Sequence, residues 1–299
     1  MSIVATLEPP LRNLGDGVQV RRALPAPHCR TVGPFVFFDQ MGPTRLAVGK
    51  GLDVRPHPHI GLATVTYLFE GEIMHRDSLG SAQIIRPSEV NWMIAGSGIV
   101  HSERSPPQAR SAGPALFGLQ CWVGLPRSEE ERAPSFDHHP STVLPLTEIG
   151  GASLRLIAGT WRGLRSPVRT LSDMVYADIV LDPGARCPIF TEHFERALYV
   201  VRGPIEVDSH RVEEGRMVIL EAGKDVTVMA QSSARVMLLG GEPLDGPRHL
   251  WWNFVSSSTE RIDQAKADWR AQRFGRVEGD DEFIPLPEEP PAAGPVRYP

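Results

Sequence analysis

The sequence lacks the features of nucleic-acid-binding, membrane and disulfide-rich proteins. No block of Lys and Arg stands out and the formal net charge is −5, so direct nucleic-acid binding is not expected. No apolar run approaches the roughly 20 residues of a membrane span, and the opening MSIVATLEPPLRN lacks the basic and apolar regions of a signal peptide. The three cysteines, Cys29, Cys121 and Cys187, form no CxxC pair and their odd number argues against a disulfide framework. These features predict a cytoplasmic protein with no membrane partner.

Helical periodicity is scarce before the end of the chain, whereas turn-forming residues are abundant. Gly and Pro number 28 each among 299 residues, of which 41% are hydrophobic. At roughly 100–200 residues per domain, this length predicts two domains with sizeable cores. Residues 62–76 and 196–241 read as short alternating strands separated by Gly, Asp and Ser. Short strands with turn signals between them predict an all-β sandwich or barrel.

One amphipathic helix is predicted within residues 256–274. Ser257 and Glu260 have the spacing of a capping box. Its apolar face consists of Ile262, Ala265 and Trp269. A helix of this length is marginal alone, so we expect this face to pack on a barrel. The acidic, proline-rich tail is expected to be extended, with three anchors: Phe283, Ile284 and Leu286.

Residues 123–151 are rich in Pro, Ser and charge. We interpret this segment as a linker followed by the first strand of a second barrel. The acidic run 129–131 is expected to be a solvated turn. His138 and His139 are expected at the surface.

The chain contains an internal repeat. YLFEGEI (67–73) and YVVRGPI (199–205) share Tyr, Gly and Ile at an offset of 132 residues, from 67 to 199. The Ala-Gly pairs at 95 and 222 recur at an offset of 127, so the first copy carries five extra residues, which we place in the turn RDSLGSAQ. The repeat predicts two copies of one β unit in tandem.

Two polar pairs share one spacing. His57 and His59 lie in RPHPHIGLATVTYLFEGE, and His101 and Glu103 lie in AGSGIVHSER. Side chains at i and i+2 of a strand point to the same face. If the two strands lie close across a barrel, the four groups converge. Imidazole suits Fe, Cu, Zn and Ni, and a carboxylate admits harder ions. A metal site is therefore predicted, and core or surface roles for the histidines are the alternative.

The second copy provides an internal control. At the same offsets, the four polar positions fall on Ile189, Thr191, Val228 and Ala230. Four polar groups facing into a barrel without a partner would be costly. The contrast therefore favours a metal site in the first copy alone. His75, in MHRDSLG, is expected to be a turn residue, with a role in the pocket as the alternative, and His193 aligns with Gly61 instead of with a ligand.

The sequence resembles the pirin family of the cupin superfamily, whose members are bicupins with one metal site. HPHIGLATVTYLFEGEIMHRDSLG resembles the first cupin motif of the family, AGSGIVHSE its second motif, and RHLWWNFVSSSTERIDQAKADW the closing segment of many bacterial members. The resemblance implies an all-β fold of two tandem cupin (jelly-roll) β-barrels with a C-terminal helix. The domains it implies are an N-terminal cupin with the metal site (1–140), a degenerate C-terminal cupin without ligands (141–255), and a helix and extended tail packing back on the barrels (256–299).

The resemblance also implies the ligands. Carried over position by position, they are His57, His59, His101 and Glu103. Family members usually have Arg where this chain has Ile60 and Glu where it has Ala63. Pirins use the later glutamate, so the metal site is expected to survive, with a change at the pocket mouth or in the substrate. One divalent ion is expected. Fe(II) is favoured, and Zn, Cu, Ni, Mn and Co stay open.

Three functions stay open at this point. The favoured one is a metal-dependent dioxygenase that uses O₂ to open flavonol-type substrates such as quercetin, with Glu103 as the catalytic base that takes the hydroxyl proton. The resemblance to eukaryotic pirins implies an alternative, a non-enzymatic iron-binding regulator with a protein partner. The third is a structural metal, since four protein ligands would close a tetrahedral zinc site.

Overall fold

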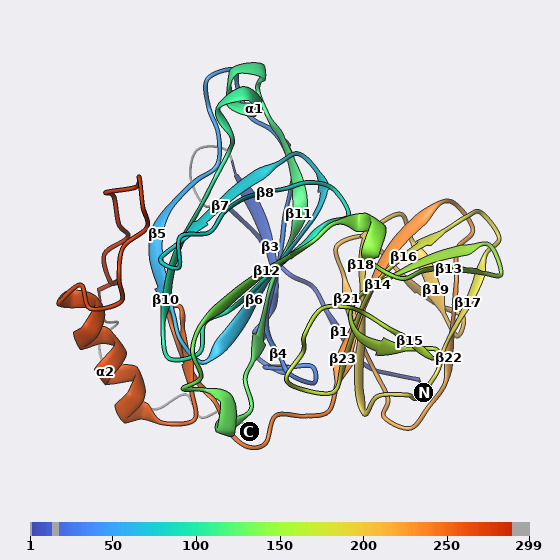
Figure 1. Cartoon of the computed structure of the whole chain (residues 1–299). Coiled ribbons are helices and arrows are strands. Elements are labelled where there is room, and N and C mark those ends of the chain that lie inside the picture. The colour runs from blue at the N-terminus through green and yellow to red at the C-terminus, as the bar shows by residue number, and fades with distance from the viewer. Residues whose placement is uncertain (1, 14–17, 289–299) are drawn as a thin grey trace. The chain divides into compact units, whose positions relative to one another are not determined.

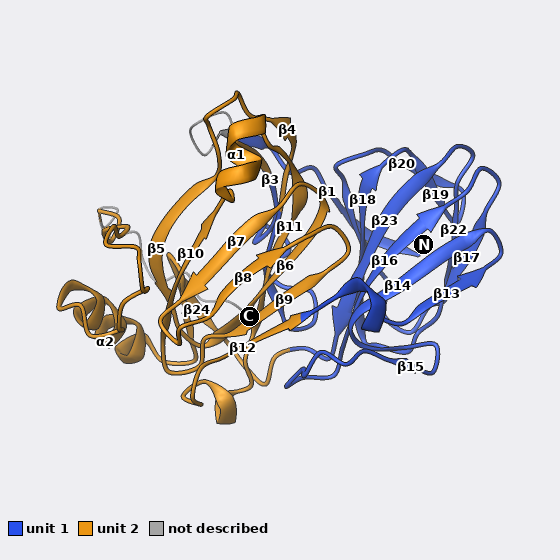
Figure 2. Ribbon diagram, turned by 45° about the horizontal axis from the view of Figure 1, so that its top comes forward, with its two compact units in different colours: residues 1–12, 21–39, 139–243 blue, residues 13–20, 40–138, 244–299 orange. Residues whose placement is uncertain are grey.

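The computed structural model describes residues 2–13 and 18–288. It is mostly β, with 51% of residues in strands and 9% in helices, which confirms the all-β bicupin fold with a C-terminal helix. No helix among the described residues is long and apolar enough to cross a membrane. The chain, whose elements are labelled in Figure 1, divides into two compact units, each built from separate segments and coloured separately in Figure 2: unit 1 is 1–12, 21–39 and 139–243, and unit 2 is 13–20, 40–138 and 244–299. The contiguous boundaries expected from the sequence (1–140, 141–255 and 256–299) stay a prediction.

Unit 1 contains two antiparallel sheets, drawn in blue in Figure 2. The larger sheet has the order β1-β21-β18-β23-β16-β14-β13, with β15 beside β14, and the smaller has the order β17-β22-β19-β20. The strands of unit 1 are β1 (Ile3–Leu7), β13 (Leu146–Ile149), β14 (Ala152–Trp161), β15 (Leu164–Arg165), β16 (Met174–Leu181), β17 (Arg186–Ile189), β18 (Glu195–Arg202), β19 (Ile205–Val207), β20 (His210–Val212), β21 (Met217–Leu220), β22 (Val226–Met229) and β23 (Ala234–Gly241).

Unit 2 has the same kind of sheet pair. One sheet contains the order β12-β9-β6-β11 and continues into β4, and the other has the order β5-β10-β7-β8. Its strands are β5 (Asp53–His59), β6 (Leu62–Glu70), β7 (Ile73–Asp77), β8 (Ala82–Ile85), β9 (Val90–Ile94), β10 (Ile99–Arg104), β11 (Ala115–Gly124), β12 (Ser135–His139), β24 (His249–Trp251) and β25 (Phe254–Ser256). Three further strands, β2 (Leu11–Asn13), β3 (Gln19–Leu24) and β4 (Phe35–Arg45), contain residues of both units, and the last residue of β12, His139, also belongs to unit 1. The helices are α1 (Pro107–Ala112), α2 (Thr259–Arg270) and the 3-10 turns η1 (Arg127–Glu129) and η2 (Ser141–Val143).

The matching stretches of the internal repeat occupy matching places in the two units. YLFEGEI runs from β6 into β7, and YVVRGPI runs from β18 into β19. The shared glycines make the turn between the strands, Gly71 at φ 89° and Gly203 at φ 70°. A Cβ would lie 2.0 Å from the carbonyl oxygen of Ala115 at the first glycine and 2.4 Å from that of Ser233 at the second. Both turns therefore need glycine, which explains why it recurs in the repeat.

The core of unit 1 fills most of the places where the first copy has polar groups. Ile189, Val228 and Ala230 are buried in one apolar cluster. Thr191 is exposed, so it does not occupy the core. In unit 2 His57 pairs with His101 across the strands, and in unit 1 the counterpart of His57, Ile189, pairs with Val226. The structural counterpart of His101 is therefore Val226, two residues before the Val228 that the sequence offset gives. The expectation of an apolar replacement is right for three of the four positions.

The C-terminal helix packs on unit 2, as expected. Ile262, Ala265 and Trp269 are all buried, in a cluster with Ile60, Val100 and Phe254. The predicted capping box is wrong by one residue. Ser258 is the N-cap, and its hydroxyl accepts a hydrogen bond from the backbone N–H of Arg261.

The acidic tail is held partly through its backbone. The N–H of Ile284 donates to the carbonyl of Pro56 at 2.8 Å, and its carbonyl accepts from the indole N–H of Trp269 at 2.9 Å. Leu286 packs on the helix cluster, while Phe283 is 47% exposed. The expected anchors are therefore unequal, and the Phe283 ring is the weakest.

The segment after β11 differs from the expected linker. Glu130 is buried, and its carboxylate pairs with Arg248 at 2.7 Å and accepts from the backbone N–H of Ser257. The prediction of a solvated turn is wrong for Glu130, because its partners come from residues more than 100 positions away in sequence. His138 and His139 lie in β12 and are half-buried, so their expected surface position is also wrong.

Candidate metal centre

Three neighbouring strands of unit 2 bring the polar pairs together (Figure 1). β10 lies between β5 and β7 and is antiparallel to both. His101 has His57 as its cross-strand partner on one side and Asp77 on the other. The β5 register shifts between His101 and Glu103, which is a bulge. A bulge re-aims the side chains that follow it.

Three imidazoles converge at this place. His57, His59 and His101 are buried, and each offers a ligand nitrogen within 4.8 Å of the other two. Their ring centroids are 4.4 Å apart for His57 and His101, and 5.0 Å apart for the other two pairs. The indole of Trp122 stands edge-on to His59 at 5.2 Å. Histidine clusters of this size, facing one point inside a barrel, suit a single metal ion.

The outer nitrogen of each ring is already held. His57 Nδ1 lies 2.8 Å from the carbonyl oxygen of Arg55, and His59 Nδ1 lies 3.2 Å from that of Asn253. A carbonyl only accepts, so both rings carry the proton on Nδ1 and leave Nε2 as a lone pair. Nε2 of His59 and Nε2 of His101 are buried without a hydrogen-bond partner among the described residues. Such orphaned nitrogens fit a metal ion in the middle of the triad.

Burial keeps the triad uncharged. It lowers the pKa of His57 to about 4, against a smaller opposing effect of the Arg55 carbonyl. Burial, followed by the neighbouring imidazoles, also lowers the pKa of His59 and His101 well below the ordinary value. Neutral imidazole is the form that binds metals. The three rings are therefore ready ligands at neutral pH.

Glu103 is buried beside the triad and outside the 4.8 Å cluster. Its Oε1 lies 3.1 Å from the hydroxyl of Thr66, which is also 2.9 Å from Gln120 Oε1. Burial raises the pKa of Glu103, and His75 and the Thr66 hydroxyl oppose that shift. The Thr66 contact holds one carboxylate oxygen, so the other is available to an ion or a substrate. Its role as the fourth ligand stays a prediction.

Sequence reasoning favoured a turn position for His75, with a pocket role as the alternative, and did not single out Asp77. His75 is not a turn residue. It lies in β7, is buried, and contacts Asp77 at 3.0 Å and His101 at 3.4 Å. The signal was present, because His75 and Asp77 have the same i, i+2 spacing as the two pairs that were selected.

The remaining sequence candidates do not join the triad. His193 is buried in unit 1, where its Nε2 contacts the carbonyl of Thr160 at 2.8 Å. His138 Nδ1 contacts Asn91 Oδ1 at 2.8 Å. Ile60 and Ala63 are fully buried, Ile60 in the cluster under α2. Their expected effect on the pocket mouth or the substrate stays a prediction.

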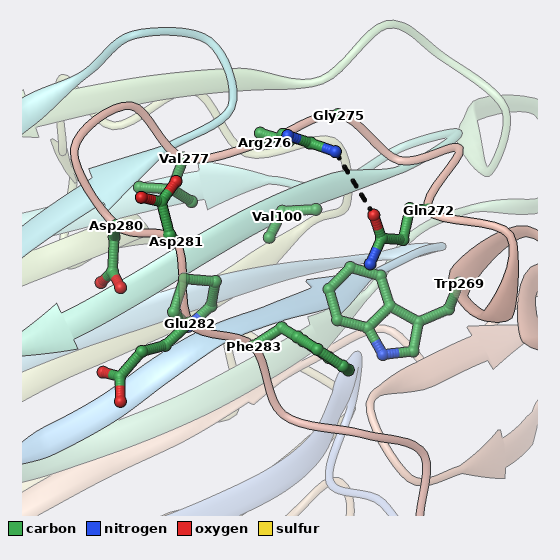
Figure 3. Close-up of a pocket in the computed structure, with 11 residues that line it drawn as sticks. Val100, Trp269, Gln272, Gly275, Arg276, Val277, Asp280, Asp281, Glu282 and Phe283 are labelled. Atoms are coloured by element: carbon green, nitrogen blue, oxygen red, sulfur yellow. Dashed lines mark hydrogen bonds between the residues drawn. The ribbon is translucent and has the colours of Figure 1, made fainter.

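A separate cavity lies on the outer face of the same strands (Figure 3). It has a volume of about 360 Å³ and lies between the tail and the side chains of Pro56 and Val100, which alternate with the histidines along β5 and β10. Residues i and i+1 of a strand point to opposite faces. The cavity is therefore on the other side of the sheet from the triad and is not the metal centre.

Comparison with known proteins agrees with this geometry. Family models named Pirin and Pirin C-terminal cupin domain match residues 17–123 and 176–275. A pirin-like protein of Caulobacter vibrioides is 50% identical over 281 residues, which cover 93% of this chain and 96% of the relative. The chain belongs to the pirin family.

Solved structures show the same relationship at the level of the fold. A quercetin 2,3-dioxygenase from Acinetobacter baumannii superimposes on this pirin with a TM-score of 0.90 and 32% identity, covering 98% of both chains. An Escherichia coli pirin, YhhW, in complex with nickel(II) matches with a TM-score of 0.65 and 19% identity, covering 80% of this chain and 99% of that one. At that identity, the second likeness shows the bicupin fold alone.

Proposed function

We propose that this pirin is a metal-dependent dioxygenase that opens the ring of flavonol-type substrates such as quercetin. The observation that carries the proposal is the convergence of three buried, neutral imidazoles, with the Nε2 atoms of His59 and His101 left without a hydrogen-bond partner among the described residues. The likeness to the quercetin 2,3-dioxygenase of Acinetobacter baumannii supports the reaction class.

The residues that would hold the ion are His57, His59, His101 and Glu103. Fe(II) is the ion we favour, and the nickel in the Escherichia coli pirin makes Ni(II) the first alternative. Four ligands on a six-coordinate ion leave two positions open, which suits an oxygen-donor substrate together with O₂. When bound, the ion would supply Lewis acidity to a substrate hydroxylate and electrons to O₂.

The residues of the chain supply the proton chemistry and the surroundings. Glu103 would accept the proton of the substrate hydroxyl on the oxygen that would otherwise bind the ion, leaving the metal briefly, while Thr66 holds the other oxygen. The buried setting raises the proton affinity of this carboxylate, which suits a base. Trp122 beside His59 gives the site an apolar wall against which an aromatic substrate can pack. The expected cytoplasmic location stays a prediction.

Oxygen uptake tests the proposal. Protein stripped of metal and reloaded separately with Fe(II), Ni(II), Co(II) or Mn(II) would be mixed with a flavonol panel in an oxygen electrode. We expect uptake with at least one metal, none with metal-free protein, and none with flavones that lack the 3-hydroxyl. Equal uptake with and without metal would contradict the proposal. An absence of uptake under every condition would favour the iron-binding regulator.

A further inference from the structure

Asp77, His75 and His101 form a buried chain of side chains that ends at the metal centre. Their exposed fractions are 1%, 3% and 1%. Asp77 Oδ2 lies 3.0 Å from His75 Nε2, and His75 Nδ1 lies 3.4 Å from His101 Nδ1. The ring of Phe136 stacks on His75 at 4.2 Å, with 13° between the planes. The stack fixes the plane of the His75 ring, so its two nitrogens stay aimed at Asp77 and His101.

The hydrogen bonds of Asp77 determine which atoms donate and which accept along the series Asp77, His75 and His101. Its Oδ1 accepts from the backbone N–H groups of Leu79 at 2.9 Å and Ser81 at 3.0 Å. Its Oδ2 can only accept, so His75 donates from Nε2. When His75 carries a single N–H, that N–H is the one on Nε2, and His75 Nδ1 is an acceptor. His101 must then donate from Nδ1, and its Nε2 carries the lone pair.

We propose that Asp77 and His75 are positioning residues that hold His101 in the tautomer whose Nε2 binds the metal ion. This inference rests on the proposed metal site. His57 and His59 obtain the same tautomer from backbone carbonyls. His101 differs because its Nδ1 faces another histidine, which can donate or accept. A carboxylate behind that histidine removes the ambiguity.

The substitution Asp77→Asn should reverse the direction of the hydrogen bonds that link residue 77, His75 and His101, without changing the shape of the side chain at position 77. The amide oxygen would stay on the N–H groups of Leu79 and Ser81, so the amide nitrogen would face His75 Nε2 and donate to it. His75 would then carry its proton on Nδ1 and donate to His101. His101 would be left with its proton on Nε2, the nitrogen that the metal needs.

Nitrogen NMR of the metal-free protein measures directly which nitrogen of His101 carries the proton. With ¹⁵N-labelled histidine at ~pH 8, where an ordinary imidazole is neutral, two-bond proton–nitrogen correlations distinguish the tautomers. We expect His101 to be protonated on Nδ1 in the wild type and on Nε2 in Asp77→Asn, with its signals identified by their loss in His101→Ala. A wild-type His101 protonated on Nε2, or no change in Asp77→Asn, would overturn the proposal.

Metal binding provides the second measurement. Titration with Ni²⁺ should show affinity about 10–100-fold lower for Asp77→Asn than for the wild type. The matched control is Asp178→Asn, which neutralises another buried carboxylate, in unit 1, and should leave the affinity unchanged. A wild-type chain that binds no metal would overturn the proposed function, whereas unchanged affinity in Asp77→Asn alone would overturn only the present proposal.

His75→Phe separates the tautomer effect from the loss of charge. Its single variant, in which Asp77 is intact, covers the case in which Asp77→Asn does not fold, because a His101 still protonated on Nδ1 alone in its NMR spectrum would overturn the proposal. Phenylalanine keeps the stack on Phe136 and removes the link between Asp77 and His101. His101 should then lose its fixed tautomer, and adding Asp77→Asn to His75→Phe should change the Ni²⁺ affinity by less than about 2-fold. A full additional loss in the double variant would show that charge alone acts, and would overturn the proposal.

Discussion

Glu103 is the residue at which metal binding and chemistry can be separated. Glu103→Gln keeps the size and one oxygen donor but removes the negative charge and the base. Because three histidines remain, we expect metal affinity to fall about 10–100-fold and O₂ uptake at metal saturation to fall more, on the order of 10²–10⁴. Steady-state uptake and metal titration on the same protein check this. Parent-rate turnover by the saturated variant would remove Glu103 from the chemistry.

His101→Ala is expected to lose metal and activity together. It removes the central ligand, which pairs with His57 across the strands, and leaves only two histidines in the cluster. His193→Gln is the matched control, since it changes a buried histidine of unit 1 that is hydrogen-bonded to a carbonyl. Metal analysis after dialysis distinguishes the two. Stoichiometric metal in His101→Ala would mean that the ion sits elsewhere.

The triad could be predicted from the sequence because the i, i+2 rule fixes which strand side chains share a face. The rule selects His57 with His59 and His101 with Glu103 without any structure. It applies equally to His75 and Asp77, although the sequence analysis expects His75 in a turn. They lie next to the triad only because β7 pairs with β10, and local sequence does not predict which strands pair.

At the level of single elements, α2 depends on the burial of one face. Trp269 is 7% exposed, and its indole N–H holds the tail through Ile284. Trp269→Ala should lower the free energy of unfolding by about 3–5 kcal/mol, since it leaves a large cavity. Urea unfolding measures the loss. Asp263→Ala, on the exposed face of the same helix, should change it by no more than about 0.5 kcal/mol, and equal losses would contradict the packing described.

Glu130 ties the segment after β11 to the start of α2. Glu130→Gln should lower the free energy of unfolding by about 3 kcal/mol, because Arg248 is buried and would lose its closest buried carboxylate. The value is at the low end because Arg248 keeps its ion pair with the partly exposed Asp245 and its hydrogen bond to the carbonyl of Leu125. Glu131→Gln removes an exposed pair with Arg261 and should lower it by less than about 1 kcal/mol. Thermal or urea unfolding that ranks the two variants in the opposite order would refute this assignment.

The start of α2 shows which features local sequence predicts and which it does not. The apolar face of α2 follows from its periodicity, whereas the cap falls on Ser258 instead of Ser257, because Ser257 donates to Glu130. Three serines in a row cannot be ranked without knowing that partner. The burial of Glu130 cannot be predicted from local sequence either, since its partners lie far away in the chain.

At the level of the whole molecule, the two units share a scaffold but differ in their interiors. Unit 1 has an apolar cluster that includes Ile189 and Val228, and unit 2 has the triad. We therefore expect one metal ion per chain, measured by elemental analysis against protein concentration. A value near two would show a second site. The internal repeat predicts the two barrels. It does not predict that each unit is assembled from separate segments, because that depends on contacts between residues far apart in the sequence.

The central claim is that the metal bound by the triad activates O₂ for transfer to a flavonol. Mass spectrometry of the product formed under ¹⁸O₂ by iron- or nickel-loaded protein tests it most directly. We predict a ring-opened product that carries both oxygen atoms of the labelled gas, and no such product from metal-free protein or from His101→Ala. A flavonol recovered unchanged, or a product whose new oxygen comes from water, would contradict the claim.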